Sequence, residues 1–170
     1  SLGIKSTATI MFGHIDDLES WVNHFELLKK IQLKTSGFTE VVPLPFVHMG
    51  SPIFLQGNSM PGPTWDEIVL MHSLARIYFY NTIDNIQASW VKLGHDGAKV
   101  LLNSGVNDLG GTLINENISR ASGANHGQET TATEFINLIK DAGKIPYLRN
   151  TLYTSFKNLE GVSTQNVIKI

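Results

Sequence analysis

The sequence contains no cysteine, and this absence excludes three kinds of chemistry. On its own the chain forms no disulfide, presents no thiol nucleophile and binds no metal through thiolates. It also lacks the G-x-S-x-G motif of serine hydrolases, a phosphate-binding P-loop and the H-E-x-x-H motif of zinc proteases. The enzyme classes that depend on those motifs are therefore not indicated.

Basic clusters and long apolar runs are also scarce. Lys and Arg total 13 against 15 Asp and Glu, the net charge is −2, and no long basic run is present. Nucleic acid is not expected as a partner, because its phosphates require clustered cations. No apolar run approaches the ~20 residues of a membrane span, and a strand-like run begins soon after Ser1. We therefore expect no membrane segment, no signal peptide and a cytoplasmic location.

The composition is that of an ordinary globular domain. The chain has 170 residues, of which 42% are hydrophobic and 16% are charged. This length permits one domain with a real hydrophobic core. We expect residues 1–153 to form that domain and residues 154–170 to form a polar tail.

Stretches with strand character alternate with helical patterns along the chain. Three helix starts are indicated by an Asp or Thr that is followed three residues later by Glu. These starts are Asp16–Glu19, Thr64–Glu67 and Thr131–Glu134, and the first helix carries an apolar stripe of Leu18, Trp21, Val22, Phe25, Leu28 and Ile31. A short helix is also expected over 96–105 and a long loop over 47–63. The predicted strands are 5–12, 38–46, 86–91 and 106–109.

This order, a strand and then a helix repeated four times, predicts an α/β fold of parallel strands. Four such units make half of a (β/α) barrel, which takes about 250 residues when complete. A small doubly wound sheet is the alternative. Either arrangement leaves open sheet edges, so the isolated chain is expected to aggregate or to need a partner half.

The most distinctive stretch is 105–127, GVNDLGGTLINENISRASGANHG, which is dense in hydrogen-bonding side chains. Each of these groups would need a partner in a buried core, whereas together they suit a loop that holds a polar ligand. The loop follows a predicted strand, where α/β sheets and barrels place their sites. Gly110 and Gly111 allow the backbone to approach a ligand closely. Glu116 and Arg120 are four residues apart, so mutual pairing is the structural alternative for both.

Histidines also occur where the predicted strands end. His14, His48 and His95 follow the first three strands, and His126 lies in the loop after the fourth. Imidazole suits acid–base chemistry or hydrogen bonding to a ligand, although loops carry polar residues in any protein. A four-histidine metal site is not favoured, because no closely spaced ligand pair accompanies these residues.

Trp90 and Lys92 are two residues apart in SWVKLG and would share one face of a strand. An aromatic ring beside a cation suits a planar ligand or a carboxylate. A core tryptophan with a lysine that reaches solvent explains the pair equally well. The other histidines, His24 and His72, lie on predicted helices and are interpreted as packing or surface residues.

Five segments, taken together and in order, resemble one enzyme family. They are STATIMFGHID (6–16), TEVVPLPFVH (39–48), IQASWVKLG (86–94), NDLGGTLINENISRASGANHG (107–127) and RNTLY (149–153). The chain looks like the C-terminal half of the radical S-adenosylmethionine (SAM) enzymes that build the deazaflavin chromophore FO. Within this FO synthase family it is most similar to the tyrosine-using subunit 2. Menaquinone-pathway relatives share the opening strand and the SWVK-like strand but match the NEN-ISR stretch less well.

The resemblance implies a (β/α) barrel whose centre holds SAM and a 4Fe-4S cluster. In that family a SAM-derived radical acts on tyrosine, and the 4-hydroxybenzyl fragment is joined to 5-amino-6-(D-ribitylamino)uracil. The cofactor-binding residues implied are Met11, Gly13 and His14. The substrate-binding residues implied are His48, Trp90, Lys92, Asn107, Asp108, Thr112, Asn115, Glu116, Ser119, Arg120 and His126.

The main departure from the family is the absence of its cluster motif, C-x-x-x-C-x-x-C. That motif belongs to the N-terminal half of those enzymes, so this chain is expected to contribute no metal ligand and to be inactive alone. The implied partners are the missing N-terminal barrel half, the companion FO synthase subunit and the two small substrates. The alternatives are a degenerate protein that only binds a ligand or a partner chain, and a menaquinone-pathway radical SAM relative.

Overall fold

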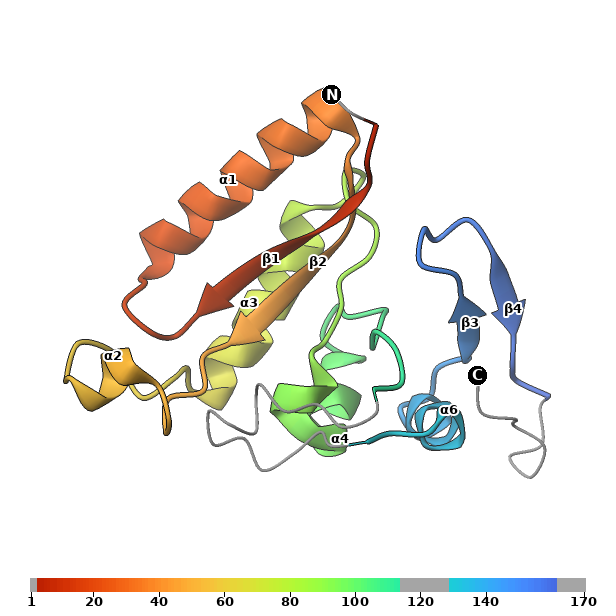
Figure 1. Ribbon diagram of the computed structural model, residues 1–170. Helices are drawn as coiled ribbons and strands as arrows, with labels where there is room; N and C mark the ends of the chain where they lie inside the picture. Colours follow the sequence, from red (N-terminus) through yellow and green to blue (C-terminus); the bar gives the residue numbers. More distant parts are fainter. Residues whose placement is uncertain (1–2, 114–128, 162–170) are drawn as a thin grey trace.

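A computed structural model describes residues 3–113 and 129–161 (Figure 1). The predicted α/β fold with parallel strands is confirmed. Strands β1 (Ser6–Phe12) and β2 (Phe38–Pro45) pair in parallel, with Thr7 opposite Glu40. Helix α1 (Leu18–Thr35) connects the two strands and lies along one side of the pair (Figure 1).

Two further segments extend the parallel order without forming full strands. β2 bridges Ile86, and the next residue, Gln87, bridges Asp108, both in parallel. The third and fourth predicted strands are therefore shorter than expected, and the third is wrong from Trp90 onward. There the chain turns into a helix that buries this apolar run in the core. The reason is that a short apolar run does not distinguish a strand from a buried helix.

Two of the remaining helices begin where the sequence predicts. The Thr64 hydroxyl accepts a hydrogen bond from Glu67 N at 3.3 Å, and the Thr131 hydroxyl accepts one from Glu134 N at 3.2 Å. Such capping boxes satisfy N–H groups that a helix start leaves free. A single helical turn also lies within the predicted loop 47–63. The helices after α1 are α2 (Pro52–Leu55), α3 (Trp65–Tyr78), α4 (Trp90–Leu101) and α6 (Ala132–Asp141).

The first helix differs from the prediction at its start and on its surface. Its N-cap is Asp17 and not Asp16, and the Asp17 carboxylate accepts from Ser20 N at 2.8 Å. Half of the predicted apolar stripe is buried, on the side of the helix where Trp21 meets Phe12 of β1 and Phe25 meets Tyr78 of α3. The buried members are Trp21, Phe25 and Leu28, and the exposed members are Leu18, Val22 and Ile31.

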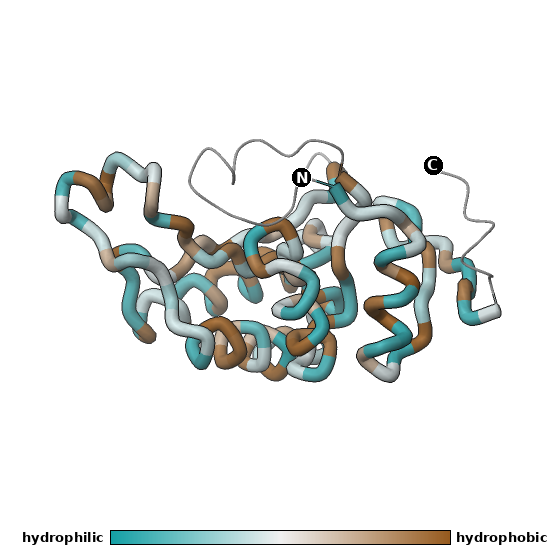
Figure 2. The backbone as a smooth tube through the Cα atoms, turned by 90° about the horizontal axis from the view of Figure 1, so that it is seen from below, coloured by the Kyte–Doolittle hydropathy of each residue, from teal (hydrophilic) through white to brown (hydrophobic). Residues whose placement is uncertain are grey.

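The two faces of β1 differ in burial. Ala8, Ile10 and Phe12 of β1 belong to the hydrophobic core with α1 and α3, while the alternate residues of β1 are exposed. This alternation follows from the pleat of a strand, which points successive side chains to opposite faces. Figure 2 shows polar and apolar residues alternating along the helices as well. One face of the sheet is thus a core. The opposite face, called the open face below, is exposed along β1, whereas Glu40 and Val42 of β2 are buried on it.

After α6 the chain forms a hairpin of β3 (Tyr147–Arg149) and β4 (Phe156–Asn158), which pair antiparallel. β4 falls within 154–170, the stretch predicted to be a polar tail. The hairpin lies at the opposite side of the molecule from α2 (Figure 1). Of the helices in the described ranges, none combines the length and apolar character needed to cross a membrane.

Candidate functional site

The open face of the sheet carries a buried carboxylate, Glu40, near the start of β2. Glu40 is 8% exposed although most of its strand is apolar. A carboxylate in such a position needs charged or hydrogen-bonding partners. Thr7, directly opposite on β1, donates its hydroxyl to Glu40 Oε1 at 2.8 Å. The other partners come from the distant C-terminal hairpin.

Arg149, the last residue of β3, binds two carboxylates on this face. Its Nη2 donates to Asp108 Oδ1 at 2.9 Å, and its Nε donates to Oδ2 of the same carboxylate. Nη2 also lies 3.7 Å from Glu40 Oε2. The hydrogen bond to Asp108 raises the pKa of Arg149 against the opposing effect of burial. A bidentate ion pair that is largely shielded from water is a stronger interaction than an ion pair on the surface.

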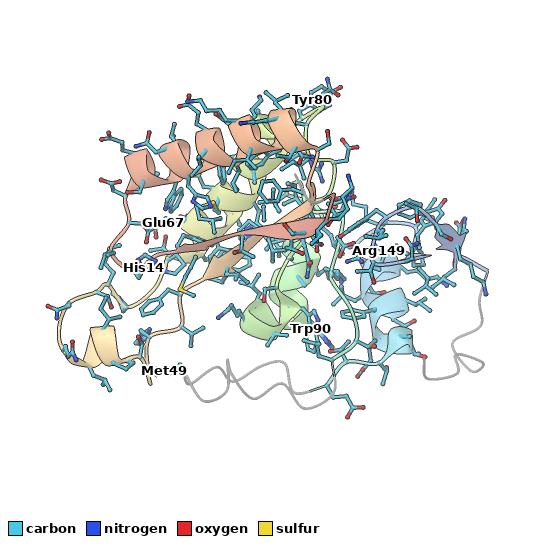
Figure 3. The ribbon with its side chains drawn as sticks, turned by 45° about the horizontal axis from the view of Figure 1, so that its top comes forward. His14, Met49, Glu67, Tyr80, Trp90 and Arg149 are labelled. Atoms are coloured by element: carbon cyan, nitrogen blue, oxygen red, sulfur yellow. The ribbon has the colours of Figure 1, made fainter. Side chains whose placement is uncertain are left out.

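Tyr153 completes this arrangement from the turn of the hairpin. Its hydroxyl donates to Glu40 Oε2, and its ring centroid lies 4.0 Å from the guanidinium carbon of Arg149. Burial, with the bond to Glu40, raises the pKa of Tyr153, so its hydroxyl remains a protonated donor. We call Thr7, Glu40, Asp108, Arg149 and Tyr153 the inner-face cluster. Figure 3 places Arg149 towards the amino end of β1, away from His14 at the carboxyl end.

The Asp108 carboxylate also binds the backbone near the start of the stretch 105–127, which we call the polar loop. Its Oδ1 accepts from Gly110 N at 2.6 Å. Gly110 has a φ of +75°, and a Cβ at this position would lie 2.4 Å from Gln87 Nε2. The close approach that this glycine permits is therefore to a side chain of the same chain.

Trp90 supports the same turn from the start of α4. Its indole Nε1 donates to Gly111 O at 3.3 Å, and its ring meets Phe135 edge-on with centroids 5.7 Å apart. Trp90 is 3% exposed and lies in a helical turn with Lys92, so the prediction that the two share a strand face is wrong. The indole packs beneath the Gly110–Gly111 turn, in agreement with the alternative interpretation of Trp90 as a core residue.

Beside Trp90 a hollow of about 450 Å³ opens between α4 and the residues that follow the polar loop. Gly94, with a φ of +69°, kinks α4 at this point. His95, predicted to follow the third strand, lies instead within α4, and its Nε2 is 2.8 Å from the Thr130 hydroxyl. The hollow is lined by Trp90, Leu93, Gly94, His95, Asp96, Glu129 and Thr130. Its carboxylates suit a ligand that carries hydrogen-bond donors.

At the end of β1, Asp16 holds the Gly13–His14 turn. Its carboxylate accepts from Gly13 N at 3.0 Å and from His14 N at 2.8 Å, and Trp21 Nε1 is a third donor. Burial alone would raise the pKa of Asp16, but these hydrogen bonds outweigh it and hold that pKa below its ordinary value. Gly13 has a φ of +84°, and a Cβ there would lie 2.3 Å from Pro63 Cδ. Only glycine fits this turn.

The first two strand exits are neighbours. The His14 ring lies edge-on to Phe46, which follows β2, with centroids 5.8 Å apart. Met11 is 48% exposed on the open face of β1. His48 packs against Phe54 of α2, with ring centroids 4.5 Å apart. Met11 and His14 thus lie at or just beyond the end of β1, while His48 precedes α2 and packs on it.

The residues around the start of the polar loop have different surroundings. The Asn107 amide oxygen accepts from Arg76 Nη2 at 2.6 Å and from Ile86 N at 2.8 Å, which ties the loop to the scaffold. Thr112 is exposed. The predicted residues Asn115, Glu116, Ser119, Arg120 and His126 lie outside the described residues.

Glu40, Arg149 and Tyr153 are all missing from the set of predicted site residues. Glu40 is the one charged residue in FTEVVPLPF (38–46). A carboxylate within such an apolar strand indicates that a charged or hydrogen-bonding partner lies beside it. Arg149 and Tyr153 are the ends of the RNTLY segment. Their pairing with Glu40 was not predictable, because Tyr153 and Glu40 are 113 residues apart in the chain.

The side chains of this chain do not fit a 4Fe-4S cluster. Within 3–113 and 129–161, no group of three or more His, Asp or Glu side chains could hold a metal ion. The whole sequence also lacks cysteine, whose thiolates hold such clusters. A cluster that works with this chain needs ligands from elsewhere.

A family profile described as "CofH/MqnC C-terminal region" matches residues 35–162. A 5-amino-6-(D-ribitylamino)uracil–L-tyrosine 4-hydroxyphenyl transferase of Methanothermobacter thermautotrophicus is 49% identical over 158 residues, which are 93% of this chain and 43% of that protein. The transferase of the same name from Methanocaldococcus jannaschii is 49% identical over 152 residues, covering 89% of this chain and 42% of that protein. An FO synthase of Mycobacterium leprae is 46% identical over 152 residues, covering 89% of this chain and 18% of that protein.

The chain spans less than half the length of the curated relatives it matches. The profile match runs from the end of α1 to beyond β4 and includes every member of the inner-face cluster except Thr7. The resemblance to the FO synthase family that the sequence indicates is confirmed. The chain belongs to the CofH/MqnC family, of which it represents the C-terminal region.

Proposed function

We propose that this chain is the substrate-holding part of a transferase that joins the 4-hydroxybenzyl group of tyrosine to 5-amino-6-(D-ribitylamino)uracil, in deazaflavin cofactor biosynthesis. The observation that carries this proposal is the 49% identity, over 93% of the chain, to a relative with that transferase name. A ribityl chain and a uracil ring present many hydrogen-bonding groups, and the loop 105–127 is dense in complementary ones. The expected cytoplasmic location belongs to the same proposal.

The proposal includes a half barrel that an N-terminal part completes. Ser6 N donates to Gly37 O at 3.0 Å, so the even-numbered residues of β1 turn their N–H and C=O groups towards β2. The odd-numbered residues turn theirs towards the free edge, where the Thr9 carbonyl accepts from His24 Nε2 at 3.0 Å. An unpaired edge of this kind is a template for another strand. The additional length of the relatives is the source we propose for that strand and for the cluster thiolates.

The proposed SAM site lies at the exit of β1. Asp16 already binds the Gly13 and His14 amides, so this exit offers a ligand the His14 ring, 27% exposed, and the Met11 side chain. Gly13 would shape the turn on which these two side chains stand. When bound, SAM would supply the radical that acts on tyrosine.

The proposed substrate shell has two layers. Thr112 and the predicted residues Asn115, Glu116, Ser119, Arg120 and His126 would contact the ribityl-uracil substrate. Trp90, Asn107 and Asp108 would shape the loop from beneath, because their polar atoms are bonded to the scaffold and the turn. His48 and Lys92 are proposed at the neighbouring exits.

Arg120→Ala tests the role of the loop, in this chain co-expressed with an N-terminal part of the kind its relatives have. We expect weaker binding of 5-amino-6-(D-ribitylamino)uracil by isothermal titration calorimetry, at unchanged iron content. Lys30→Ala is the matched control, since Lys30 is a surface cation of α1 paired with Glu26 at 2.7 Å. Unchanged affinity in Arg120→Ala would remove Arg120 from the site. If the unmodified protein does not bind this compound, the proposal is rejected. Binding without product would favour the degenerate alternative.

A further inference from the structure

The Asp108 carboxylate is bound from two directions. From the hairpin, Arg149 donates through Nε and through Nη2, the latter at 2.9 Å. From the polar loop, Gly110 N donates to Oδ1 at 2.6 Å. The backbone of Asp108 is in turn bridged to Gln87. Arg149 and the Gly110 amide thus bind the same carboxylate, so Arg149 is in a position to orient it.

Arg149 is itself fixed by contacts that do not involve the loop. Its guanidinium carbon lies 4.0 Å from the Tyr153 ring centroid, and its Nη2 lies 3.7 Å from Glu40. Glu40 is held by the Tyr153 hydroxyl and by Thr7, which donates at 2.8 Å. β1, β2 and the hairpin therefore orient the plane of the guanidinium. A lysine at this position would keep the positive charge but could not make the planar, bidentate hydrogen bonds of the guanidinium.

The turn that depends on Asp108 has little room to move. A Cβ on Gly110 would lie 2.4 Å from Gln87 Nε2, so the backbone is already in close contact on that side. Gly111 O is fixed by Trp90 Nε1 at 3.3 Å. A displacement of Asp108 by about an ångström would break one of these contacts. A displacement of about an ångström exceeds the accuracy with which groups that bind a ligand must be placed.

From these contacts we propose that Arg149 is a positioning residue for the Gly110–Gly111 turn. Acting through Asp108, it orients this turn and so sets the affinity for the substrate that binds beside it. Arg149 lies towards the amino end of β1 (Figure 3), and its guanidinium is already bound to Asp108 and placed over the Tyr153 ring. Its role is thus to orient and not to contact. The proposal rests on the proposed function in one respect, that the loop 105–127 holds the uracil substrate.

The test compares Arg149→Met and Arg149→Lys with Leu28→Ala in the protein completed by its N-terminal part. Leu28 is 6% exposed in the core beneath α1, so its truncation lowers stability without touching the inner-face cluster. The first measurement is KM and kcat for 5-amino-6-(D-ribitylamino)uracil. The second is the hydrogen-exchange rate of the Gly110 and Gly111 amides. The melting temperature is recorded for all three variants.

Arg149→Met is expected to raise KM about tenfold with kcat changed by less than about threefold, and to speed exchange at Gly110 about tenfold. For Arg149→Lys, we expect a KM and a Gly110 exchange rate between those of Arg149→Met and those of the unmodified protein. Leu28→Ala should lower the melting temperature without raising KM and without speeding exchange at Gly110. If Arg149→Met and Leu28→Ala behave alike in both measurements, the proposal is overturned.

Failure of the proposed function has a different signature. In that case the unmodified protein neither binds nor converts the uracil compound, whatever residue stands at position 149. The exchange measurement still decides the role of Arg149. Faster exchange at Gly110 in Arg149→Met than in Leu28→Ala supports the positioning role, and equal exchange overturns it.

Discussion

The buried histidine His72 makes the stability of the chain depend on pH in a direction set by its surroundings. It lies on α3 with none of its surface exposed, and its Nδ1 donates to Ile68 O at 2.7 Å. In the part of the chain that the structure describes, its Nε2 has no hydrogen-bond partner. Burial lowers the pKa of His72 from 6.5 to about 4, against the opposing effect of the bond to Ile68. The folded chain thus keeps the ring neutral where the unfolded chain protonates it.

A folded-state pKa below the unfolded value means that the unfolded chain binds more protons between the two values. The contribution of His72 to stability is therefore fully present above pH 6.5 and is lost as the pH falls towards 4. The difference between 6.5 and about 4 corresponds to about 3 kcal/mol of unfolding free energy. This is a large part of the ~5–15 kcal/mol that stabilises a typical domain.

Urea denaturation at about pH 7.5 and about pH 4.5 measures this effect. We expect the unmodified chain to lose about 2 to 3 kcal/mol from His72 over this interval. His72→Gln does not titrate. Its unfolding free energy should be lower than that of the unmodified chain at about pH 7.5, but should fall by about 2 to 3 kcal/mol less between the two pH values. Met71→Leu, a buried and non-titrating change on the same helix, should retain the full loss. An equal loss in His72→Gln and in the unmodified chain would refute the reasoning from burial.

Two further substitutions test local features of the fold by urea denaturation. Gly13 and Gly57 both have left-handed φ angles, of +84° and +74°, but a Cβ would lie 2.3 Å from Pro63 only at Gly13 and meets nothing within 4 Å at Gly57. Gly57→Ala should therefore cost about 1 kcal/mol and Gly13→Ala about 3 kcal/mol or more, and equal costs would contradict the steric argument. Thr131→Ala removes the hydroxyl that caps α6 and should cost about 1 kcal/mol, whereas Thr131→Ser should retain the cap. An alanine variant as stable as the serine variant would show that this cap contributes nothing.

Features that depend on neighbours along the chain were predictable from the sequence. Thr64 and Thr131 begin α3 and α6 as expected, because a capping box needs only residues three apart. Asp16 and Asp17 are adjacent, and either could cap α1. The structure assigns the cap to Asp17 because the Gly13–His14 turn and the Trp21 indole bind the Asp16 carboxylate. The competition between these partners is tertiary and leaves no local signal.

Features that depend on distant partners were not predictable. The run that begins at Trp90 has the composition of a strand, but Trp90 packs on Phe135 and supports Gly111, and the chain becomes helical there. The charge of Glu40 indicates that partners exist, yet nothing near it in the sequence identifies Arg149 or Tyr153. Sequence patterns therefore located the exits of the first two strands, while the exit of the third and the support beneath the polar loop required the fold.

Product formation by the completed protein is the most direct test of the central claim. The chain is combined with a cluster-bearing N-terminal part and supplied with SAM, a reductant, tyrosine and 5-amino-6-(D-ribitylamino)uracil, and products are identified by mass spectrometry. We predict that the 4-hydroxybenzyl adduct of the uracil compound forms with both parts present and with neither part alone. Absence of the adduct, in a preparation that holds the cluster and cleaves SAM, would contradict the proposed function.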